Sequence, residues 1–461
     1  MSMLYFKPTL LYSLLFSLLL SGCASLQTPY TAPVTQVPTQ WQYASAATAT
    51  NTDPWWTRFN DPVLDQLVEQ ALLRNNNLAA ATIRVRQAQL QARLAENRPN
   101  FSGSLNTGAS RTLNSPTTTV RSSGANLGAS YEVDLWNKLG SQRDVALWEA
   151  RATEQDRAAT ALALVGTTAQ IYWQLGYLNQ RLTANLQSIA TAEKTLQLVQ
   201  VQASAGAVGG LELAEARQSL LNLQANHTTL QQQAVAASTA LALLFDAAPG
   251  SPPAQPQTLP TSSLPEVAAG LPVELLGHRP DLRAAELRLR ESHANIAATR
   301  ASYYPALTLT GALGTSSASL LNLLSNPVAS LGLGIGLPFL NQKEMDLSIQ
   351  IAQAQSDAAV VNFRQTLYTA LGDVDNALSA RQQLRQQAVL LAQALTAATQ
   401  AERIYGVRYR AGSVALKPWL DAQESRRNAE IALAENRLNQ FNNHATLVLA
   451  LGGDALLQTA P

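Results

Sequence analysis

One structural unit occurs twice along this chain of 461 residues: a strand-like segment that leads directly into a very long helical segment. The first copy opens at Gly124, where apolar and polar residues alternate as in a β-strand with one apolar face. From Trp136 to Ala203 the chain has no proline and is rich in residues that favour helix. A helix of about 65 residues is several times the usual length, so the pattern does not predict an ordinary globular domain.

The second copy repeats this plan about 206 residues later. Alternation resumes at Leu331, and a proline-free segment follows from Asn341 to Tyr409. The same shift aligns Pro99 with Pro305. It also aligns the glycine-containing turn at 205–208 with the turn at 411–414. Internal duplication is the simplest explanation of this pattern.

The repeats, the turn residues and the proline-rich stretches together predict the order of segments. We expect a signal peptide at 1–22, a lipidated N-terminal tether at 23–60, a first repeat at 61–250, a Pro-rich linker at 251–272, a second repeat at 273–453 and a tail at 454–461. Within the repeats we expect a helix, a β-hairpin (100–135 and 306–339), a long helix (136–204 and 341–410) and a return helix (211–246 and 415–452).

The N-terminus has the pattern of a bacterial export signal. Lys7 is followed by an apolar stretch from Leu10 to Leu20, which is too short to span a membrane as a helix. The sequence Leu20-Ser21-Gly22-Cys23 then matches the lipobox, in which the cysteine becomes the lipid-bearing N-terminus. We therefore expect a lipid on Cys23, the only cysteine of the chain. The alternative is a plain signal peptide with an incidental cysteine.

The composition narrows the possible partners. The formal net charge is +1, so no strongly basic surface favours nucleic acid. Charged residues make up 14% of the chain, whereas about 25% is usual for globular proteins. So few charges suit a protein with lipid-facing and inter-subunit surfaces.

Four amphipathic strands per chain predict a membrane pore that several copies of the chain form together. Beyond the signal segment no apolar stretch approaches the ~18 residues of a spanning helix, so a closed β-barrel is the remaining way to cross a bilayer. Bacterial barrels begin at about 8 strands, so one chain must share strands with identical copies. The predicted fold is mainly α with a small membrane β-barrel portion: a trimeric 12-stranded β-barrel continuous with a long α-helical barrel. Polar strand residues predicted to line the barrel lumen are Ser102, Ser104, Asn126, Ser130, Glu132, Thr308 and Thr310.

Several motifs carry a family resemblance. They are Trp55-Trp56 with Phe59, Asp61 and Leu64; Gly277-His278-Arg279-Pro280-Asp281-Leu282; Tyr304-Pro305-Ala306-Leu307; and the two glycine-containing turns. On these residues the chain closely resembles TolC-like outer membrane factors of the NodT-type lipoprotein subgroup, over nearly its whole mature length. The resemblance implies a homotrimer in the outer membrane, in contact with its lipid, with a helical tunnel in the periplasm. It also implies export of small toxic compounds with a periplasmic membrane-fusion adaptor and an inner-membrane pump, for which the resistance–nodulation–division type is expected.

The same resemblance implies roles for residues near the ends of the long helices. The hairpin tips would meet the adaptor, at Gly206 and Val208 in the first half and Gly412 and Val414 in the second. Asp421 matches an acidic residue around the periplasmic aperture, and Glu212 and Glu215 take corresponding places in the first half. The alternative for all three carboxylates is a local one, because acidic residues in the first turn of a helix favour its dipole.

Other classes of function have less support. The mature chain has no HExxH motif, no P-loop and no cysteine nucleophile, so we expect neither an enzyme nor a cofactor. Histidines 227, 278, 293 and 444 are too scattered to predict a metal site. A second alternative, a coiled-coil structural lipoprotein without a pore, does not account for the four amphipathic strands. Within the channel class, the alternative is the exit duct of a type I protein secretion system.

Overall fold

The computed structural model describes residues 29–43, 54–96, 98–113, 116, 118–248, 254–318 and 320–453. These residues fall into two compact units, each with segments from both halves of the chain. Of the described residues, the first unit contains those within 29–34, 85–153 and 285–364. The second contains those within 35–84, 154–284 and 365–453.

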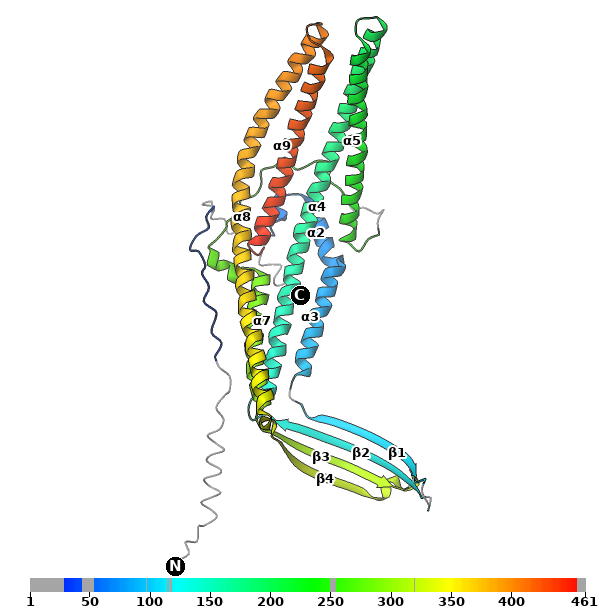
Figure 1. Cartoon of the computed structure of the whole chain (residues 1–461), viewed down its shortest axis with the longest axis vertical. Helices are drawn as coiled ribbons and strands as arrows, with labels where there is room; N and C mark the ends of the chain where they lie inside the picture. The colour runs from blue at the N-terminus through cyan, green and yellow to red at the C-terminus, as the bar shows by residue number, and fades with distance from the viewer. Residues whose placement is uncertain are drawn as a thin grey trace, which may run out of the picture. The chain divides into compact units, whose positions relative to one another are not determined.

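The first unit holds a four-stranded antiparallel sheet (Figure 1). Its strands are β1 (Asn100–Arg111), β2 (Thr119–Val133), β3 (Ala306–Ser317) and β4 (Pro327–Gly336), and they follow one another in that order across the sheet. The short 3-10 helix η3 (Leu320–Ser325) connects β3 and β4. Pairing between β2 and β3, for example Leu127 with Leu313, joins the two hairpins into one sheet.

Short connections join the strands of the first unit to its helices. The Asp134 carboxylate accepts hydrogen bonds from the backbone N–H groups of Leu139 (3.1 Å) and Gly140 (2.8 Å), at the start of α4 (Lys138–Ser204). The indole N–H of Trp136 donates to the Pro305 carbonyl at 2.9 Å. These contacts fix where β2 ends and where α4 begins. The other helices that contribute to this unit are α3 (Asn76–Leu94), α7 (Pro280–Ser302) and α8 (Gln342–Arg410), with η4 (Pro338–Leu340) before α8.

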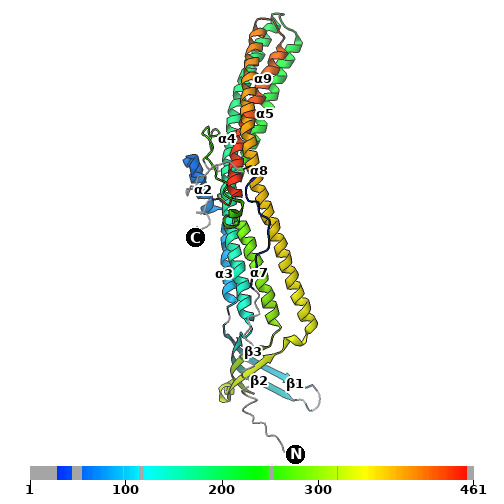
Figure 2. The same ribbon diagram turned by 90° about the vertical axis from the view of Figure 1, so that its left-hand side faces the viewer.

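The second unit is built around two helical hairpins, α4 with α5 (Gly210–Leu243) and α8 with α9 (Leu416–Ala450) (Figures 1 and 2). Seam positions of the return helix α5 are buried, namely Ala216, Leu223 and Leu230. Small and apolar side chains at this spacing let long helices pack along their length. Shorter elements of the same unit are η1 (Thr57–Phe59), α2 (Pro62–Arg74), η2 (Pro272–Glu274) and α6 (Leu275–His278).

An aromatic cluster forms the centre of the second unit's core. Trp55 and Trp173 are fully buried, and the ring centroids of Trp173 and Phe441 lie 5.0 Å apart. Phe59 packs edge-on against the imidazole of His444 at 5.2 Å. Trp55 therefore packs within the helical core and is not an exposed aromatic platform. Burial lowers the pKa of His444 to about 3, and the positive charges of Arg381, Arg58 and Arg385 act in the same direction.

The Arg-Pro-Asp motif links several helices within the second unit through hydrogen bonds. The Arg279 guanidinium donates to Asp281 at 2.7 Å, to Asp373 of α8 at 3.3 Å, and to the carbonyl of Ala450 at the end of α9 at 3.2 Å. Gly452, at a φ of +96°, lies so close to His278 that an added Cβ would meet its carbonyl at 2.6 Å. The motif therefore joins the start of α7 to two other helices.

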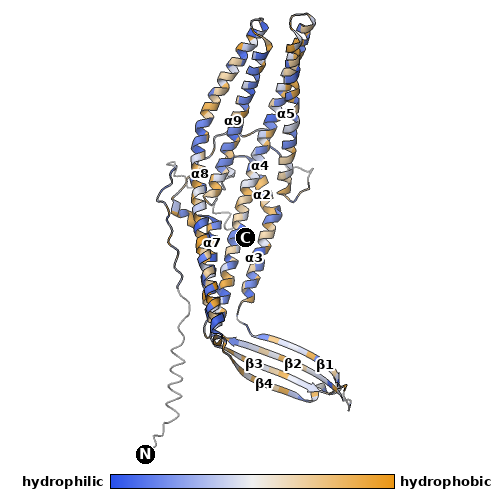
Figure 3. Cartoon of the chain, viewed as in Figure 1, coloured by the Kyte–Doolittle hydropathy of each residue, from blue (hydrophilic) through white to orange (hydrophobic). Residues whose placement is uncertain are grey.

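Hydrophilic and hydrophobic residues are interspersed along the long helices (Figure 3). Among the helices of the described residues, none combines the length and the apolar character needed to cross a membrane.

Candidate functional site

The sheet has one polar and one apolar face. Residues paired across antiparallel strands point to the same side, so the register assigns every strand position to a face. One row joins Ser102, Gly128, Ala312 and Ser330, and the adjacent row on that face joins Asn100, Ser130, Thr310 and Gly332. All seven residues predicted to line a lumen lie on this face: Ser102, Ser104, Asn126, Ser130, Glu132, Thr308 and Thr310. The opposite face carries the large apolar side chains, which are exposed in one chain: Phe101, Leu105, Leu127, Leu309, Leu313, Leu331, Leu333 and Ile335.

Glu132 is the one charged residue among the strand positions of the polar face. It lies at the end of β2 that leads into α4, and its carboxylate accepts a hydrogen bond from the Lys138 ammonium at 2.6 Å. Both side chains are partly exposed. The lysine therefore pairs with the only charged residue among the described strand positions of this face, which is otherwise rich in hydroxyls, amides and glycines.

The two hairpin turns have the same construction. Gly206 and Gly412 have φ values of +72° and +68°, which glycine adopts without strain. The Ala207 N–H donates to the Gln202 carbonyl at 2.9 Å, and the Ser413 N–H donates to the Arg408 carbonyl at 2.9 Å. This is the hydrogen bond of a Schellman motif, so each glycine ends its long helix.

A small apolar cluster joins the two hairpins just below these turns. Val199 and Leu416 are fully buried in it, and the predicted tip residues Val208 and Val414 pack against it. Tyr409 of α8 stacks on Trp419 at 5.2 Å. The Tyr409 hydroxyl donates to the side-chain carbonyl of Gln202, on α4, at 2.7 Å. Burial raises the pKa of Tyr409, and the nearby Glu212 carboxylate adds to this shift.

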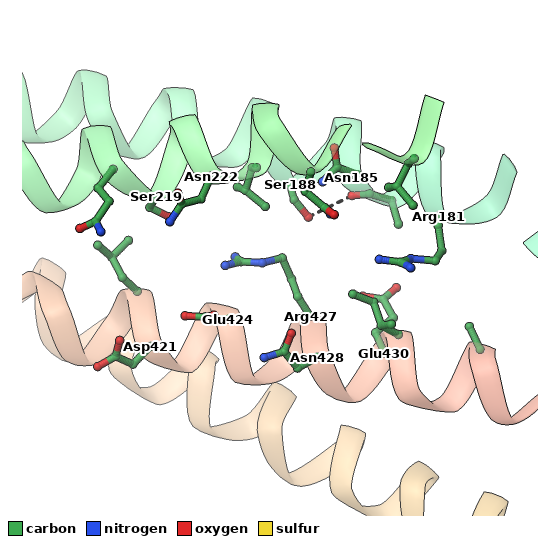
Figure 4. A pocket seen from close by; sticks show the side chains of 18 of the residues that line it. Arg181, Asn185, Ser188, Ser219, Asn222, Asp421, Glu424, Arg427, Asn428 and Glu430 are labelled. Carbon is green, nitrogen blue, oxygen red and sulfur yellow. Dashed lines mark hydrogen bonds between the residues drawn. The ribbon is translucent and has the colours of Figure 1, made fainter. Parts of the chain in front are cut away.

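A polar cavity of about 550 Å³ lies farther along the same hairpins (Figure 4). Its lining comes from α4, α5 and α9. Figure 4 shows the Arg427 side chain reaching from α9 into this space. Burial lowers the pKa of Arg427, and its guanidinium has no hydrogen-bond partner among the described residues. On the opposite wall the buried Asn185 carbonyl oxygen likewise lacks a partner within the described part of the chain.

The three predicted aperture carboxylates have different surroundings. Glu212 accepts a hydrogen bond from the Gly209 N–H at 3.0 Å and so caps the start of its own helix, α5. Glu215 and Asp421 line the cavity, and Asp421 forms an ion pair with Lys417 one turn away. The Asp421 carboxylate raises the pKa of Lys417. Glu215 and Asp421 therefore line the same cavity, whereas Glu212 caps a helix.

Sequence patterns did not single out Arg427, Asn185, Gln202 or Tyr409. Each lies in a long helical segment where polar residues are expected on the solvent side, and only the pairing of the hairpins gives them their neighbours.

Two other expectations concern lipidation and metal binding. Cys23, the predicted lipid-bearing residue, lies outside the described residues. Within the described residues, no group of His, Cys, Asp and Glu side chains could hold a metal ion.

A sheet with one polar and one apolar face, and helical hairpins with a polar space between them, are features of membrane channel subunits. The comparisons with known proteins agree. The sequence profile of the family described as "Outer membrane efflux protein" matches residues 67–245 and 271–453. The chain belongs to this family, and it functions as an outer membrane efflux channel.

The chain is similar to several named members over almost its full length. "Pyoverdine export outer membrane protein OpmQ" of Pseudomonas putida is 34% identical over 467 residues, which cover 97% of each chain. "Toxin and drug export protein A" of Aggregatibacter actinomycetemcomitans is 28% identical, covering 94% of this chain and 95% of its own. The crystal structure of the open state of the MtrE outer membrane channel of Neisseria gonorrhoeae aligns with a TM-score of 0.81 and 30% identity, covering 94% and 98%.

Proposed function

We propose that three copies of this chain form one channel, each contributing its four strands to a closed 12-stranded barrel continuous with a helical tunnel. The observation that carries the proposal is the strand register, which gathers the polar residues on one face and the large apolar residues on the other. In addition, β1 and β4 are the outermost strands of the sheet, and an open edge cannot be hydrogen-bonded in lipid. Copies that pair β4 with the next β1 would satisfy both edges.

The exported substrates in this proposal are small toxic compounds such as drugs. They are passed to the channel by an inner-membrane pump of the resistance–nodulation–division type through a periplasmic adaptor that meets the hairpin tips. The export of pyoverdine by the relative OpmQ supports a small-molecule substrate. A second candidate is an exit duct for protein secretion, which the name of the toxin and drug export relative favours.

The direct tests are the oligomeric state and the ion conductance of the purified protein. Purified full-length protein should sediment as a trimer and conduct ions across a planar bilayer. Protein that stays monomeric and leaves the bilayer insulating at saturating concentration would contradict the proposal. A strain that lacks the gene distinguishes the two candidate substrates. It should accumulate a fluorescent drug if the channel exports small molecules, and it should retain a secreted protein if the channel exports proteins.

The lipid anchor is a further part of the proposal, and it concerns Cys23. We expect Cys23→Ala to abolish labelling of the protein by radioactive palmitate, because the thiol is the atom that takes the lipid. Ser21→Ala, which leaves the thiol in place, is the matched control and should keep the label. Undiminished labelling of the Cys23 variant would rule the anchor out.

Asp421 tests the proposed aperture role. Asp421→Ala should raise single-channel conductance, because the proposed role places three copies of this carboxylate around a narrow aperture, where they repel anions. Glu212→Ala serves as the comparison, since its carboxylate caps α5 and should affect helix stability more than conductance. Equal conductance in the wild type and the Asp421 variant would remove this residue from the gate.

Lys138 tests whether the polar face lines a lumen. Replacing Lys138 with Met removes the positive charge that pairs with Glu132 and makes the net charge of the polar face more negative, so the channel should become severalfold more permeable to cations than to anions. Lys343→Met, which removes the same charge from an exposed position near the start of α8, should leave selectivity unchanged. The reversal potential in a salt gradient measures both. An unchanged reversal potential in the Lys138 variant would mean that Glu132 does not face the pore.

A further inference from the structure

Two arginines on the apolar face of the sheet form no hydrogen bond or ion pair with any of the described residues. Arg111 ends β1, and Arg121 lies near the start of β2. Arg121 is paired with Ala109, two residues before Arg111, so the arginines are diagonal neighbours on one face, about 7–8 Å apart at Cα. Both side chains are exposed, and neither forms an ion pair among the described residues. The one acidic residue of the four strands, Glu132, lies on the other face and at the other end of β2.

The rows of this face change character before they reach the arginines. From Val133 to Ala125 the β2 residues of this face belong to rows of mostly apolar side chains. The next row is made of hydroxyls, with Thr107 and Ser123 hydrogen-bonded to each other at 3.2 Å and Ser317 paired beside them. Arg121 and Arg111 follow this row. Apolar, hydroxyl and cationic side chains therefore succeed one another along a single face.

This succession matches the layers of a membrane surface. The step from Val133 to Ala125 spans about 27 Å along the strand, at about 3.4 Å per residue. At a tilt of about 40° it covers roughly 20 Å across the membrane, close to the apolar band of about 25 Å of outer-membrane barrels. The hydroxyls and arginines then reach the headgroup layer. Because the opposite end of β2 leads into α4, the arginines lie at the membrane surface away from the helices.

We infer that Arg111 and Arg121 form a binding site for the phosphate groups of lipid headgroups at this surface. Each guanidinium presents five N–H donors in a planar fork that matches phosphate oxygens, and no carboxylate on the same face competes for them. The inference rests on the proposed barrel, which makes this face the lipid-facing one. A trimer would carry three such sites around its rim.

The test uses full-length trimers in detergent and diphosphoryl lipid A as the probe, with bound lipid measured by native mass spectrometry. Replacing both arginines with Gln should weaken lipid A binding by about thirtyfold, since each basic residue near an anionic surface contributes about one kcal/mol. Arg84→Gln with Arg86→Gln, which removes the same charge from exposed positions of α3, should bind like the wild type. Equal binding by wild type and the Arg111/Arg121 variant would overturn the inference.

Two further measurements, competition by inorganic phosphate and channel conductance, distinguish the possible outcomes. Excess inorganic phosphate should not displace lipid A, and complete displacement would identify a free-anion site in place of a lipid site. Conductance in planar bilayers is measured for every variant and should not change. Loss of lipid binding with normal conductance supports the site, whereas absent conductance in the wild type would count against the proposed channel itself. If the double variant does not conduct, the single variants are compared, each with an intermediate loss expected.

Discussion

Replacing Tyr409 with phenylalanine is expected to raise the open probability of the reconstituted channel by about two- to twelvefold. The Tyr409 hydroxyl donates to Gln202, so it links the end of α8 to the end of α4 at the hairpin tips. A partly buried hydrogen bond of this kind contributes about 0.5–1.5 kcal/mol. We propose that it favours the closed arrangement of the tips, so that its loss shifts the population toward the open one. The stacked ring on Trp419 stays in place, so the hairpin itself should remain folded.

The matched control for this prediction is Tyr405→Phe. Tyr405 lies one turn earlier on α8, and its hydroxyl has no hydrogen bond within the described part of the chain. Its variant should therefore show wild-type open probability in single-channel recordings. If both phenylalanine variants behave like the wild type, the bond between the hairpins does not hold the channel closed.

Acidification is expected to destabilise the protein through His444. The pKa of this buried imidazole falls from its usual 6.5 to about 3 because burial disfavours the charged form. Between these two values the unfolded chain binds a proton that the folded protein does not, so stability falls as the pH drops below 6.5. From pH 7 to pH 4.5 the loss from this one group amounts to about 3 kcal/mol. The loss arises because protonation would place a positive charge among buried aromatic rings.

A variant without the titrating group measures this contribution. His444→Gln should lose less thermal stability than the wild type over the same pH interval, as followed by circular dichroism. His278→Gln, at an exposed position, should show the wild-type pH dependence. A wild-type response in the His444 variant would assign the acid sensitivity to other groups.

Local patterns predicted much of the secondary structure. The long helices were expected at 136–204 and 341–410, and the structure has them at Lys138–Ser204 and Gln342–Arg410. Both the helical composition and the terminating glycines are properties of neighbouring residues, which is why sequence alone can locate them. The two-residue period of the strands likewise assigned Ser102, Asn126 and Thr308 to the polar face before any pairing was known.

Contacts between distant residues could not be predicted in the same way. Tyr409 and Gln202 lie 207 positions apart, and nothing in either segment specifies the other. Arg427 looks like an ordinary polar residue of a long helix, and only the facing walls of α4 and α5 place it in a cavity. Glu212 and Glu215 looked equivalent in sequence, yet one caps a helix and the other lines the cavity.

The sequence by itself determined the duplicated strand-and-helix units and the two faces of each strand, because both depend on residue type and on a period of two or 3.6 along the chain. Only the tertiary structure decided which polar side chains meet across the hairpins, which carboxylates line the cavity, and which arginines stand together with no acidic partner among the described residues. The reason is physical: burial, pKa shifts and paired charges depend on distances through space, which the spacing of residues along the chain does not specify.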